Sequence, residues 1–507
     1  MNWMDLFHAT LPVTVLEVAA LVVLVFDLAL LRKAAANSRL AGAVVLGVLG
    51  CGAAAFVFYH HTAPLFASNH ALLYNQAYSA VAQTAIFALT AMTLLLLPGT
   101  KFTRHPAEFV ATVLFAASGG LLVVAARDLL VLFVGLELLS LSLYIMTAFA
   151  KSSEKSAEAA LKYYLFGGMS AAFMLFGFSY IYGLTGSTGF DEIIQSFQQT
   201  GSAQSPLFLV AMVAVAAGLG FKVAAVPFHL WAPDAYEGAP TPAAAFIASV
   251  SKVASFALLA GLAYSAAFAL HNGKLPVAHI AANNRVVAVI LFLAAASMVV
   301  GNLAALAQTS VRRLLAYSAI AHAGYMLLGV AAAALASDAE AMTRSVNTVL
   351  FYVITYGLTT IAAFGVIGVV EQATGSNKLD AFSGLHKRNP LLAAVLLILF
   401  LSLAGIPPLV GFWAKFNLFA AVLGTGSGVV PFALVALAIA MSAVSLYYYL
   451  RVLKFAYVVE PVEGAGKITA HPVVLLVLVA IAVAVVWIGC APAGLVDWIA
   501  KPGLPLL

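Results

Sequence analysis

Residues 206–231 read PLFLVAMVAVAAGLGFKVAAVPFHLW, an apolar run interrupted by one lysine, Lys222, and one proline, Pro227. A membrane-spanning helix needs roughly 20 mostly apolar residues, so this run is long enough to cross a bilayer. A proline inside such a helix frees a backbone carbonyl, which a membrane tolerates only where protein or water satisfies it. The stretch therefore predicts a broken membrane helix with a lysine beside the break.

The composition of the whole chain agrees with a membrane protein. Of its 507 residues 64% are apolar and only 8% are charged, whereas a soluble domain is about 45–50% apolar and about 25% charged. The net charge is +5, but the basic residues are scattered singly and form none of the clusters that nucleic-acid binding requires. Cys51 and Cys490 have no metal-ligand spacing, so we expect no metal site.

Apolar runs of about 18 or more residues divide the chain into about fourteen expected spans. The first run is too long for the core of a signal peptide and is interpreted as a retained helix. The expected spans lie near 12–31, 41–58, 76–97, 107–126, 129–150, 157–183, 206–229, 241–269, 286–306, 313–335, 346–370, 391–423, 431–455 and 472–498.

The loop charges predict an orientation, because Lys and Arg of short loops concentrate on the cytoplasmic side. If the N-terminus lies outside, the cytoplasmic loops hold 15 Lys and Arg and the outer loops hold 5. Both termini are then expected on the outer side. Four lysines remain, and they fall inside expected spans: Lys162, Lys222, Lys252 and Lys415.

These four intramembrane lysines are candidate functional residues. A charge at the bilayer centre costs about 2.5–3.5 kcal/mol, so an ionisable residue there indicates function by default. Arginine stays charged at any accessible pH, whereas a buried lysine can release its proton. Lys162 has a structural alternative, since Glu158 lies four residues earlier and an i,i+4 ion pair near the helix end is equally consistent with the sequence.

Three other ionisable residues within expected spans are also candidates. Glu137 is the acid nearest to mid-span, and an isolated carboxylate there should be protonated or paired with a buried lysine. His229 shares a helix face with Lys222. His322 is also mid-span, and although a single buried histidine is more often a satisfied core residue, its place in an internal repeat makes it a candidate.

That repeat appears when the chain is aligned with itself. Residues 127–137 align with 312–322 at an offset of 185, which stacks Glu137 on His322, and residues 226–227 align with 406–407. Two copies of five helices each must cross the membrane in opposite directions, as in many secondary transporters. The expected fold is an all-α polytopic membrane protein of about fourteen transmembrane helices, with two inverted five-helix repeats that each contain a broken helix.

The repeat also predicts a division of the chain. Residues 1–106 would form three N-terminal helices, 107–270 the first repeat, 285–456 the second repeat and 457–507 a C-terminal helix. Lys222 precedes the proline of its break, whereas Lys415 follows the prolines of the second break. We therefore do not expect the two lysines to be equivalent.

Six motifs of the chain lie at 133–137, 161–168, 220–242, 249–253, 316–322 and 405–416. Together they resemble the antiporter-like membrane subunits of proton-pumping NADH:quinone oxidoreductase, respiratory complex I. The segment around Lys162 and a lysine instead of a glutamate at position 415 favour subunit N over subunit M. The absence of a long amphipathic helix after the last span disfavours subunit L.

This resemblance implies roles for the candidate residues. Glu137 would pair with and tune Lys222, Lys252 would connect two half-channels, and His322 would continue the polar line. Lys415 would exchange protons with the second channel, with Lys162 and His229 as supporting residues.

The resemblance also implies a translocase subunit of a bacterial inner membrane that works beside other complex I membrane subunits in the lipid bilayer. This chain would carry no cofactor, since NADH, flavin, iron–sulfur clusters and quinone would belong to partner subunits. The isolated chain would have no redox activity. Two alternatives remain open: a subunit of a multi-subunit cation/proton antiporter, and a membrane scaffold that transports nothing.

Overall fold

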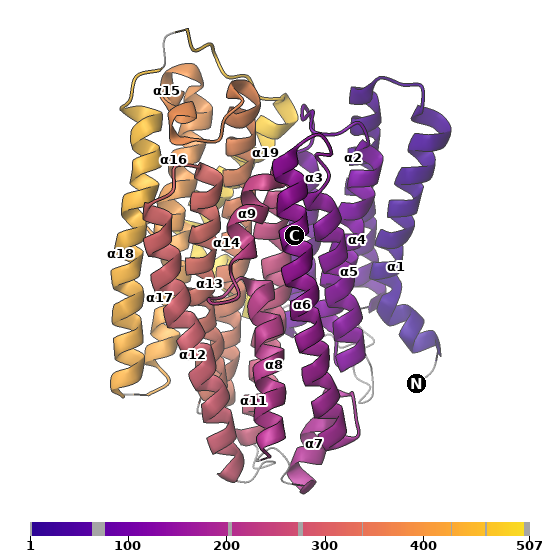
Figure 1. Ribbon diagram of the computed structural model, residues 1–507, viewed down its shortest axis with the longest axis vertical. Helices are drawn as coiled ribbons and strands as arrows, with labels where there is room; N and C mark the ends of the chain where they lie inside the picture. Colours follow the sequence, from indigo (N-terminus) through magenta and orange to yellow (C-terminus); the bar gives the residue numbers. More distant parts are fainter. Residues whose placement is uncertain are drawn as a thin grey trace.

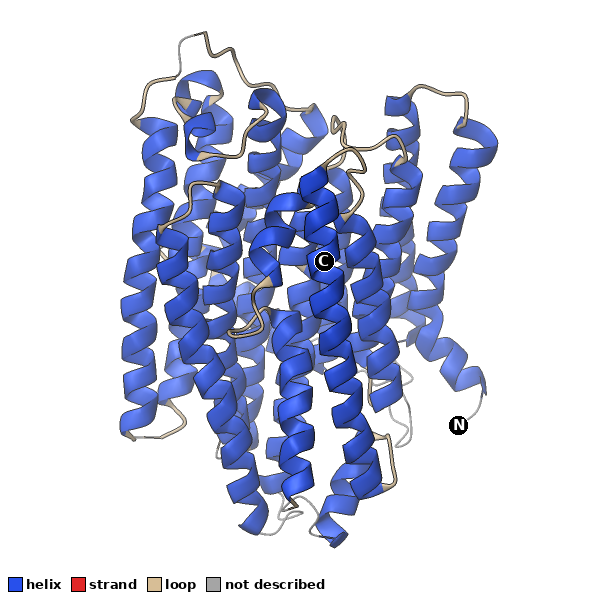
Figure 2. Cartoon of the chain, in the orientation of Figure 1, coloured by secondary structure: helices blue, strands red, loops and turns tan. Residues whose placement is uncertain are grey.

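The computed structural model describes residues 3–62, 77–200, 205–271, 277–336, 338–426, 428–461 and 464–500. Its helices run roughly parallel to one another in a single bundle (Figure 1), and loops join them at the two ends (Figure 2). Within the described ranges, 13 helices are long and apolar enough to cross a membrane. The shorter α16 and α17 follow one another along the bundle and supply one further, broken crossing, so the expectation of about fourteen spans is confirmed.

The helices of the first half have the following bounds: α1 (Trp3–Phe26) with the π-helical η1 (Asp27–Leu31), α2 (Ala36–Val57) with η2 (Phe58–Thr62), α3 (Ala77–Leu95), α4 (Pro106–Ala125), α5 (Leu129–Thr147), α6 (Glu154–Thr185), α7 (Phe190–Thr200), α8 (Pro206–Val223), α9 (Trp231–Gly238), α10 (Thr241–Ala248) and α11 (Val250–His271). The second half comprises α12 (Val277–Leu306), α13 (Val311–Leu335), α14 (Ala339–Thr374), the short 3₁₀ helix η5 (Leu379–Phe382), α15 (Leu385–Arg388), α16 (Pro390–Ala404), α17 (Val410–Leu423), α18 (Val429–Tyr457), α19 (Pro472–Cys490) and α20 (Pro492–Ala500).

Two equivalent turns mark the inverted repeat. Each has the sequence Thr-Gly-Ser, at 185–187 and at 374–376, with the glycine in the left-handed region at φ +71° and +72°. Directly after each turn an isolated antiparallel bridge joins the chain to the N-cap of an earlier helix, Asp128 of α5 or Ser310 of α13. The first turn leads into α7 at one end of the bundle and the second lies near α15 at the other end (Figure 1). The repeats therefore run in opposite directions, as expected.

The structure corrects the register of the repeat in its first two helices. A Cβ on Gly119 would lie 2.4 Å from the amide nitrogen of Leu139, and a Cβ on Gly301 would lie 2.5 Å from that of Ala321. These matched contacts give an offset of 182 positions, not 185. His322 therefore corresponds to Ser140, and the stacking of Glu137 on His322 is wrong. A slip of three residues is close to one helical turn, so the same apolar pattern fits both alignments.

Both predicted breaks are present. α8 ends at Val223 and α16 ends at Ala404, and each is followed by a residue with positive φ and then by a cis X-Pro bond. The last helical residues before the breaks, Val223 and Ala404, set this part of the repeat at an offset of 181. Lys222 then corresponds to Leu403, while Lys415 corresponds to Asp234. The expected lack of equivalence between the two lysines is confirmed.

A third break was not expected. The apolar run near 241–269 is divided at Ser249, where α10 ends and α11 begins. Neither proline nor glycine marks this position, so local sequence gives no signal for it. The break lies three residues before Lys252.

Candidate functional site

Four of the candidate residues lie in the interior of the bundle: Lys222, Lys252, His322 and Lys415, which we call the buried line. Each is at most 8% exposed. They come from α8, α11, α13 and α17, so the line includes both repeats.

Lys222 occupies the last turn of α8 and faces α5. Its ammonium donates to the Ser140 hydroxyl and lies 3.5 Å from the carbonyl of Leu136. Among the described residues no ion pair within 4.0 Å joins it to Glu137, so the expected direct pairing is absent. Ser140 holds the ammonium one turn away from Glu137, which is half-buried on the same helix. The carboxylate is therefore placed to act on Lys222 through the electric field and not through contact.

Lys252 connects the two repeats. Its ammonium donates to the Val223 carbonyl at 3.0 Å and to the Ala319 carbonyl at 2.9 Å. Val223 is the last residue of α8, so its carbonyl has no partner from its own helix, and Ala319 belongs to α13 of the second repeat. The ammonium of Lys252 thus satisfies the free carbonyl at the helix break and contacts α13 one turn before His322.

His322 is held by two tyrosine hydroxyls. Nδ1 lies 2.9 Å from the Tyr352 oxygen and Nε2 lies 3.3 Å from the Tyr449 oxygen. A neutral imidazole has one donor and one acceptor nitrogen, so one tyrosine donates to the ring while the other accepts from it. The ring can therefore take up a proton at one nitrogen and release another at the opposite nitrogen.

Lys415 repeats the arrangement at the second break. Its ammonium donates to the Ala404 carbonyl at 2.9 Å and to the Ser442 hydroxyl at 2.8 Å, and lies 5.4 Å from the centre of the Tyr325 ring. Ala404 corresponds to Val223 in the repeat. In each copy, the last carbonyl before the break accepts from a buried lysine.

Sequence reasoning missed the neutral polar groups between the charged ones. The Tyr449 hydroxyl also hydrogen-bonds the Ser318 hydroxyl, and the Asn302 side chain joins Tyr325 to Tyr448 at 3.1 Å on each side. A signal for them was present in α18, where Ser442, Ser445, Tyr448 and Tyr449 recur at helical spacing in an otherwise apolar segment.

Lys162 and His229 lie apart from the buried line. The Lys162 side chain is 41% exposed and pairs with Glu158 at 2.6 Å and with Asp234 at 2.9 Å, so the expected i,i+4 pair is formed. His229 lies in the connection between α8 and α9. Its Nδ1 has no hydrogen-bond partner among the described residues.

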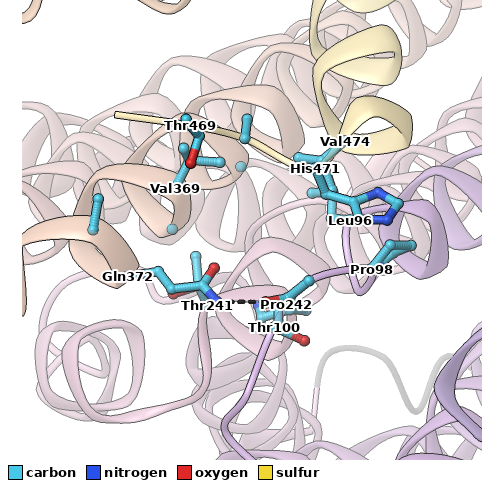
Figure 3. A pocket seen from close by; sticks show the side chains of 15 residues that line it. Leu96, Pro98, Thr100, Thr241, Pro242, Val369, Gln372, Thr469, His471 and Val474 are labelled. Atoms are coloured by element: carbon cyan, nitrogen blue, oxygen red, sulfur yellow. Dashed lines mark hydrogen bonds between the residues drawn. The ribbon is translucent and has the colours of Figure 1, made fainter. Parts of the chain in front are cut away.

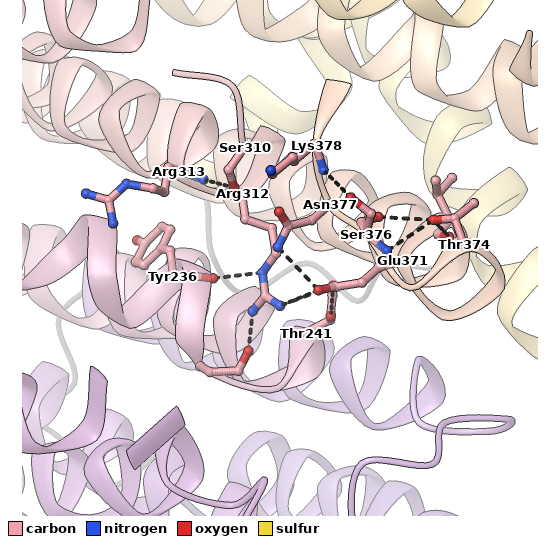
Figure 4. Close-up of polar contacts among 12 residues, drawn as sticks. Tyr236, Thr241, Ser310, Arg312, Arg313, Glu371, Thr374, Ser376, Asn377 and Lys378 are labelled. Atoms are coloured by element: carbon pink, nitrogen blue, oxygen red, sulfur yellow. Dashed lines mark hydrogen bonds and ion pairs between the residues drawn. The ribbon is translucent and has the colours of Figure 1, made fainter. Parts of the chain in front are cut away.

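Lys162 instead belongs to a charged cluster at one end of the bundle. Asp234 of α9 also pairs with Arg313 at 2.6 Å, at the start of α13. The neighbouring Arg312 is buried, donates to the carbonyls of Tyr236 and Ala239, and pairs with Glu371 of α14 at 3.1 Å (Figure 4). These contacts fix α9, the half-helix beyond the first break, to the second repeat.

The structure also has a cavity that lies away from the buried line. A cavity of about 250 Å³ lies between the loop after α3, the end of α14 and residues 469–471, where Thr241, Gln372 and His471 contribute polar groups (Figure 3). No residue of the buried line contributes to its lining.

Across the part of the chain that the structure describes, no group of three or more His, Cys, Asp or Glu side chains is placed to hold a metal ion.

Comparison with known proteins places these features in a family. The family model described as "NADH:quinone oxidoreductase/Mrp antiporter, TM" matches residues 126–442. The NADH-quinone oxidoreductase subunit N 2 of Acidobacterium capsulatum is 44% identical over 98% of this chain and 99% of its own length.

Solved structures give the same result. A chain of respiratory complex I from Thermus thermophilus, solved with bound aureothin, matches with a TM-score of 0.76 at 31% identity over 96% of this chain and 99% of its own. A chain of the Mrp complex from Dietzia sp. matches with a TM-score of 0.78 over 97% of this chain and 96% of its own, at 21% identity, which shows the shared fold. The chain therefore belongs to the NADH:quinone oxidoreductase/Mrp antiporter membrane family and, within it, to the subunit N group of antiporter-like complex I subunits.

Proposed function

We propose that this chain moves protons across the membrane through the buried line, as one subunit of an NADH:quinone oxidoreductase whose redox chemistry lies in other subunits. The observation that carries the proposal is the pair of contacts made by Lys252, since one titratable cation bonds both the break of the first repeat and α13 of the second. Titratable or hydroxyl groups lie on both sides of it.

The proposed cycle begins at Lys222. A proton held there is stabilised by the negative charge of Glu137, and loss of that stabilisation drives the proton toward Lys252. At an effective dielectric constant of about 20, two unit charges about 8 Å apart interact by about 2 kcal/mol. This is comparable to the roughly 2.3 kcal/mol with which a potential of 100 mV opposes each charge, so a switch of this kind is large enough without direct contact.

The signal to Glu137 would come from a neighbouring subunit. Glu137 is half-buried, and Val134 and Leu141, one turn away on either side of it, are 58% and 48% exposed. The exposed faces of α5 and α6 together form an apolar surface beside an ionisable group. We propose that another complex I membrane subunit packs here and changes the charge state near Glu137.

The second half of the cycle uses His322 and Lys415. A proton leaving Lys252 would pass to the imidazole, whose two nitrogens contact Tyr352 and Tyr449. The hydroxyls of α18 and the ammonium of Lys415 would complete the path. Lys162 and His229 would support the first repeat, Lys162 by holding α9 in place through Asp234.

Purification of the tagged chain in mild detergent tests the assignment. We expect it to retain the redox subunits and the other membrane subunits of an NADH:quinone oxidoreductase in equal amounts, and expect the same chain stripped of partners to show no flavin or iron–sulfur absorbance. Recovery of antiporter subunits without redox subunits would identify a subunit of a multi-subunit cation/proton antiporter. Recovery of no stoichiometric partner would favour a membrane scaffold that transports nothing.

The orientation is tested by the two Thr-Gly-Ser turns, which provide matched insertion sites. A compartment-sensitive reporter inserted after Gly375 should report the cytoplasm, because most loop Lys and Arg share that end of the bundle. The same reporter inserted after Gly186 should report the outer compartment, as should a fusion after Leu507, which lies outside the described residues. The reverse pattern would overturn the proposed placement of both termini. The same compartment at both turns would contradict the inverted repeats on which the proposed division into 1–106, 107–270, 285–456 and 457–507 rests.

A further inference from the structure

A narrow apolar groove runs along α8 where this helix meets α11, α12 and α13. Its volume is about 180 Å³. On α8 the lining extends from Leu209 to Val223, which is about 21 Å at a rise of 1.5 Å per residue. Half of a bilayer's hydrocarbon core is about 15 Å, so the groove extends through the depth of one leaflet.

The lining changes character along its length. Almost all of the lining side chains are aliphatic, and Arg285 is the charged one among them. Arg285 lies where the apolar segment of α12 begins, at the end of the groove near Leu209 and Ala334. The opposite end reaches Val223 and Ala225 at the break of the first repeat.

The groove is accessible from the lipid-facing surface. Leu209 and Val213 line it and are 40% and 54% exposed, and Phe292, on the neighbouring helix α12, is 67% exposed. An apolar cavity of about 150 Å³ stays dry and binds small hydrocarbons. In a membrane, the hydrocarbon that reaches such a surface is the acyl chain of a lipid.

Arg285 indicates which lipid headgroup the groove would bind. Its side chain is exposed, and no carboxylate of the described residues lies within ion-pair distance of it. A guanidinium binds phosphate through two parallel hydrogen bonds. We propose that this groove binds one anionic phospholipid, with an acyl chain against α8 and its phosphate on Arg285.

This site has a consequence for the buried line. Val223, at the inner end of the groove, is the residue whose carbonyl accepts from Lys252. A bound acyl chain covers the break from the hydrocarbon side and excludes water there. The lipid site goes beyond the proposed function, since binding does not require that the lysines carry protons.

Two substitutions on α8 separate the groove from the general surface. Ala216 lines the groove, so Ala216→Phe fills it, whereas Val210 is 48% exposed and lies outside the lining, so Val210→Phe adds the same ring to the surface. The intact complex is exchanged into nanodiscs of equal phosphatidylglycerol and phosphatidylethanolamine. Phospholipids that remain bound after release are then counted by native mass spectrometry.

We expect the parent and Val210→Phe complexes to keep one phosphatidylglycerol that Ala216→Phe loses. Arg285→Gln should lower the ratio of retained phosphatidylglycerol to phosphatidylethanolamine about fivefold, the effect of removing one basic residue near the headgroups. An equal lipid count in parent and Ala216→Phe, or an unchanged headgroup ratio in Arg285→Gln, would overturn the proposal. Loss of a protein subunit from Ala216→Phe with no change in lipid would assign the groove to a partner helix instead.

Discussion

Replacing Lys222 by Met should reduce the share of NADH-driven proton uptake that this chain carries in inside-out vesicles about tenfold or more, which corresponds to about 1.4 kcal/mol or more in the barrier. Methionine fills similar space but carries no proton. Assembly should survive, because the groups that Lys222 contacts keep a partner: the Ser140 hydroxyl donates to the Leu136 carbonyl within α5. The measurement is the initial rate of vesicle acidification, normalised to assembled complex by blot.

Lys222→Arg is the matched variant that retains the charge. Arginine keeps a cation facing Ser140 but does not release a proton at accessible pH, so we expect proton uptake to fall nearly as far as with Met. A lysine with only a structural role predicts the reverse order, with Arg close to the parent. Near-normal proton uptake by the Arg variant would remove Lys222 from the path.

Replacing Arg312 by Met should have the opposite signature, a loss of assembled complex with little change in pumping per complex. Arg312 is buried, and its removal leaves the Tyr236 and Ala239 carbonyls without this donor and Glu371 without its cation. A carbonyl left in the interior without a donor costs about 1–3 kcal/mol, whereas Glu371 is 28% exposed and gains water in place of the guanidinium. The measurement is the yield of intact complex on native gels and its thermal midpoint.

Arg313→Met is the control for Arg312. Arg313 also pairs with acids of α9, but Asp234 keeps Lys162 as a partner and Glu237 is 21% exposed, so Lys162 and water replace the lost guanidinium. We expect its yield to stay close to that of the parent. Equal losses in the two variants would show that total charge in the cluster matters and the buried pairing does not.

The helix breaks and the buried lysines were predictable from the sequence because each has a local signature. Pro227 and Pro407 mark the two main breaks, and a lysine within an apolar run is conspicuous wherever it occurs. The break at Ser249 was not predictable, since its backbone carries no glycine or proline and its position depends on packing among helices far apart in the sequence.

The contacts that each candidate residue makes could not be predicted from the sequence either. Choosing Ser140 over Glu137 as the contact of Lys222 depends on a shift of less than one helical turn, which the apolar pattern does not define. The tyrosines around His322 come from α14 and α18, more than 25 residues away in either case. Periodicity shows which face of a helix is buried, but it does not show which buried faces meet.

The most direct test of the buried line is the number of protons moved per electron transferred, measured in the same vesicles for the parent and for Lys222→Arg. Electron flow from NADH to quinone and vesicle acidification are recorded together under a clamped membrane potential. The account predicts that the ratio of protons to electrons falls in the variant, because the protons that this subunit carries in the parent no longer cross the membrane through it. An unchanged ratio at normal assembly would contradict the account.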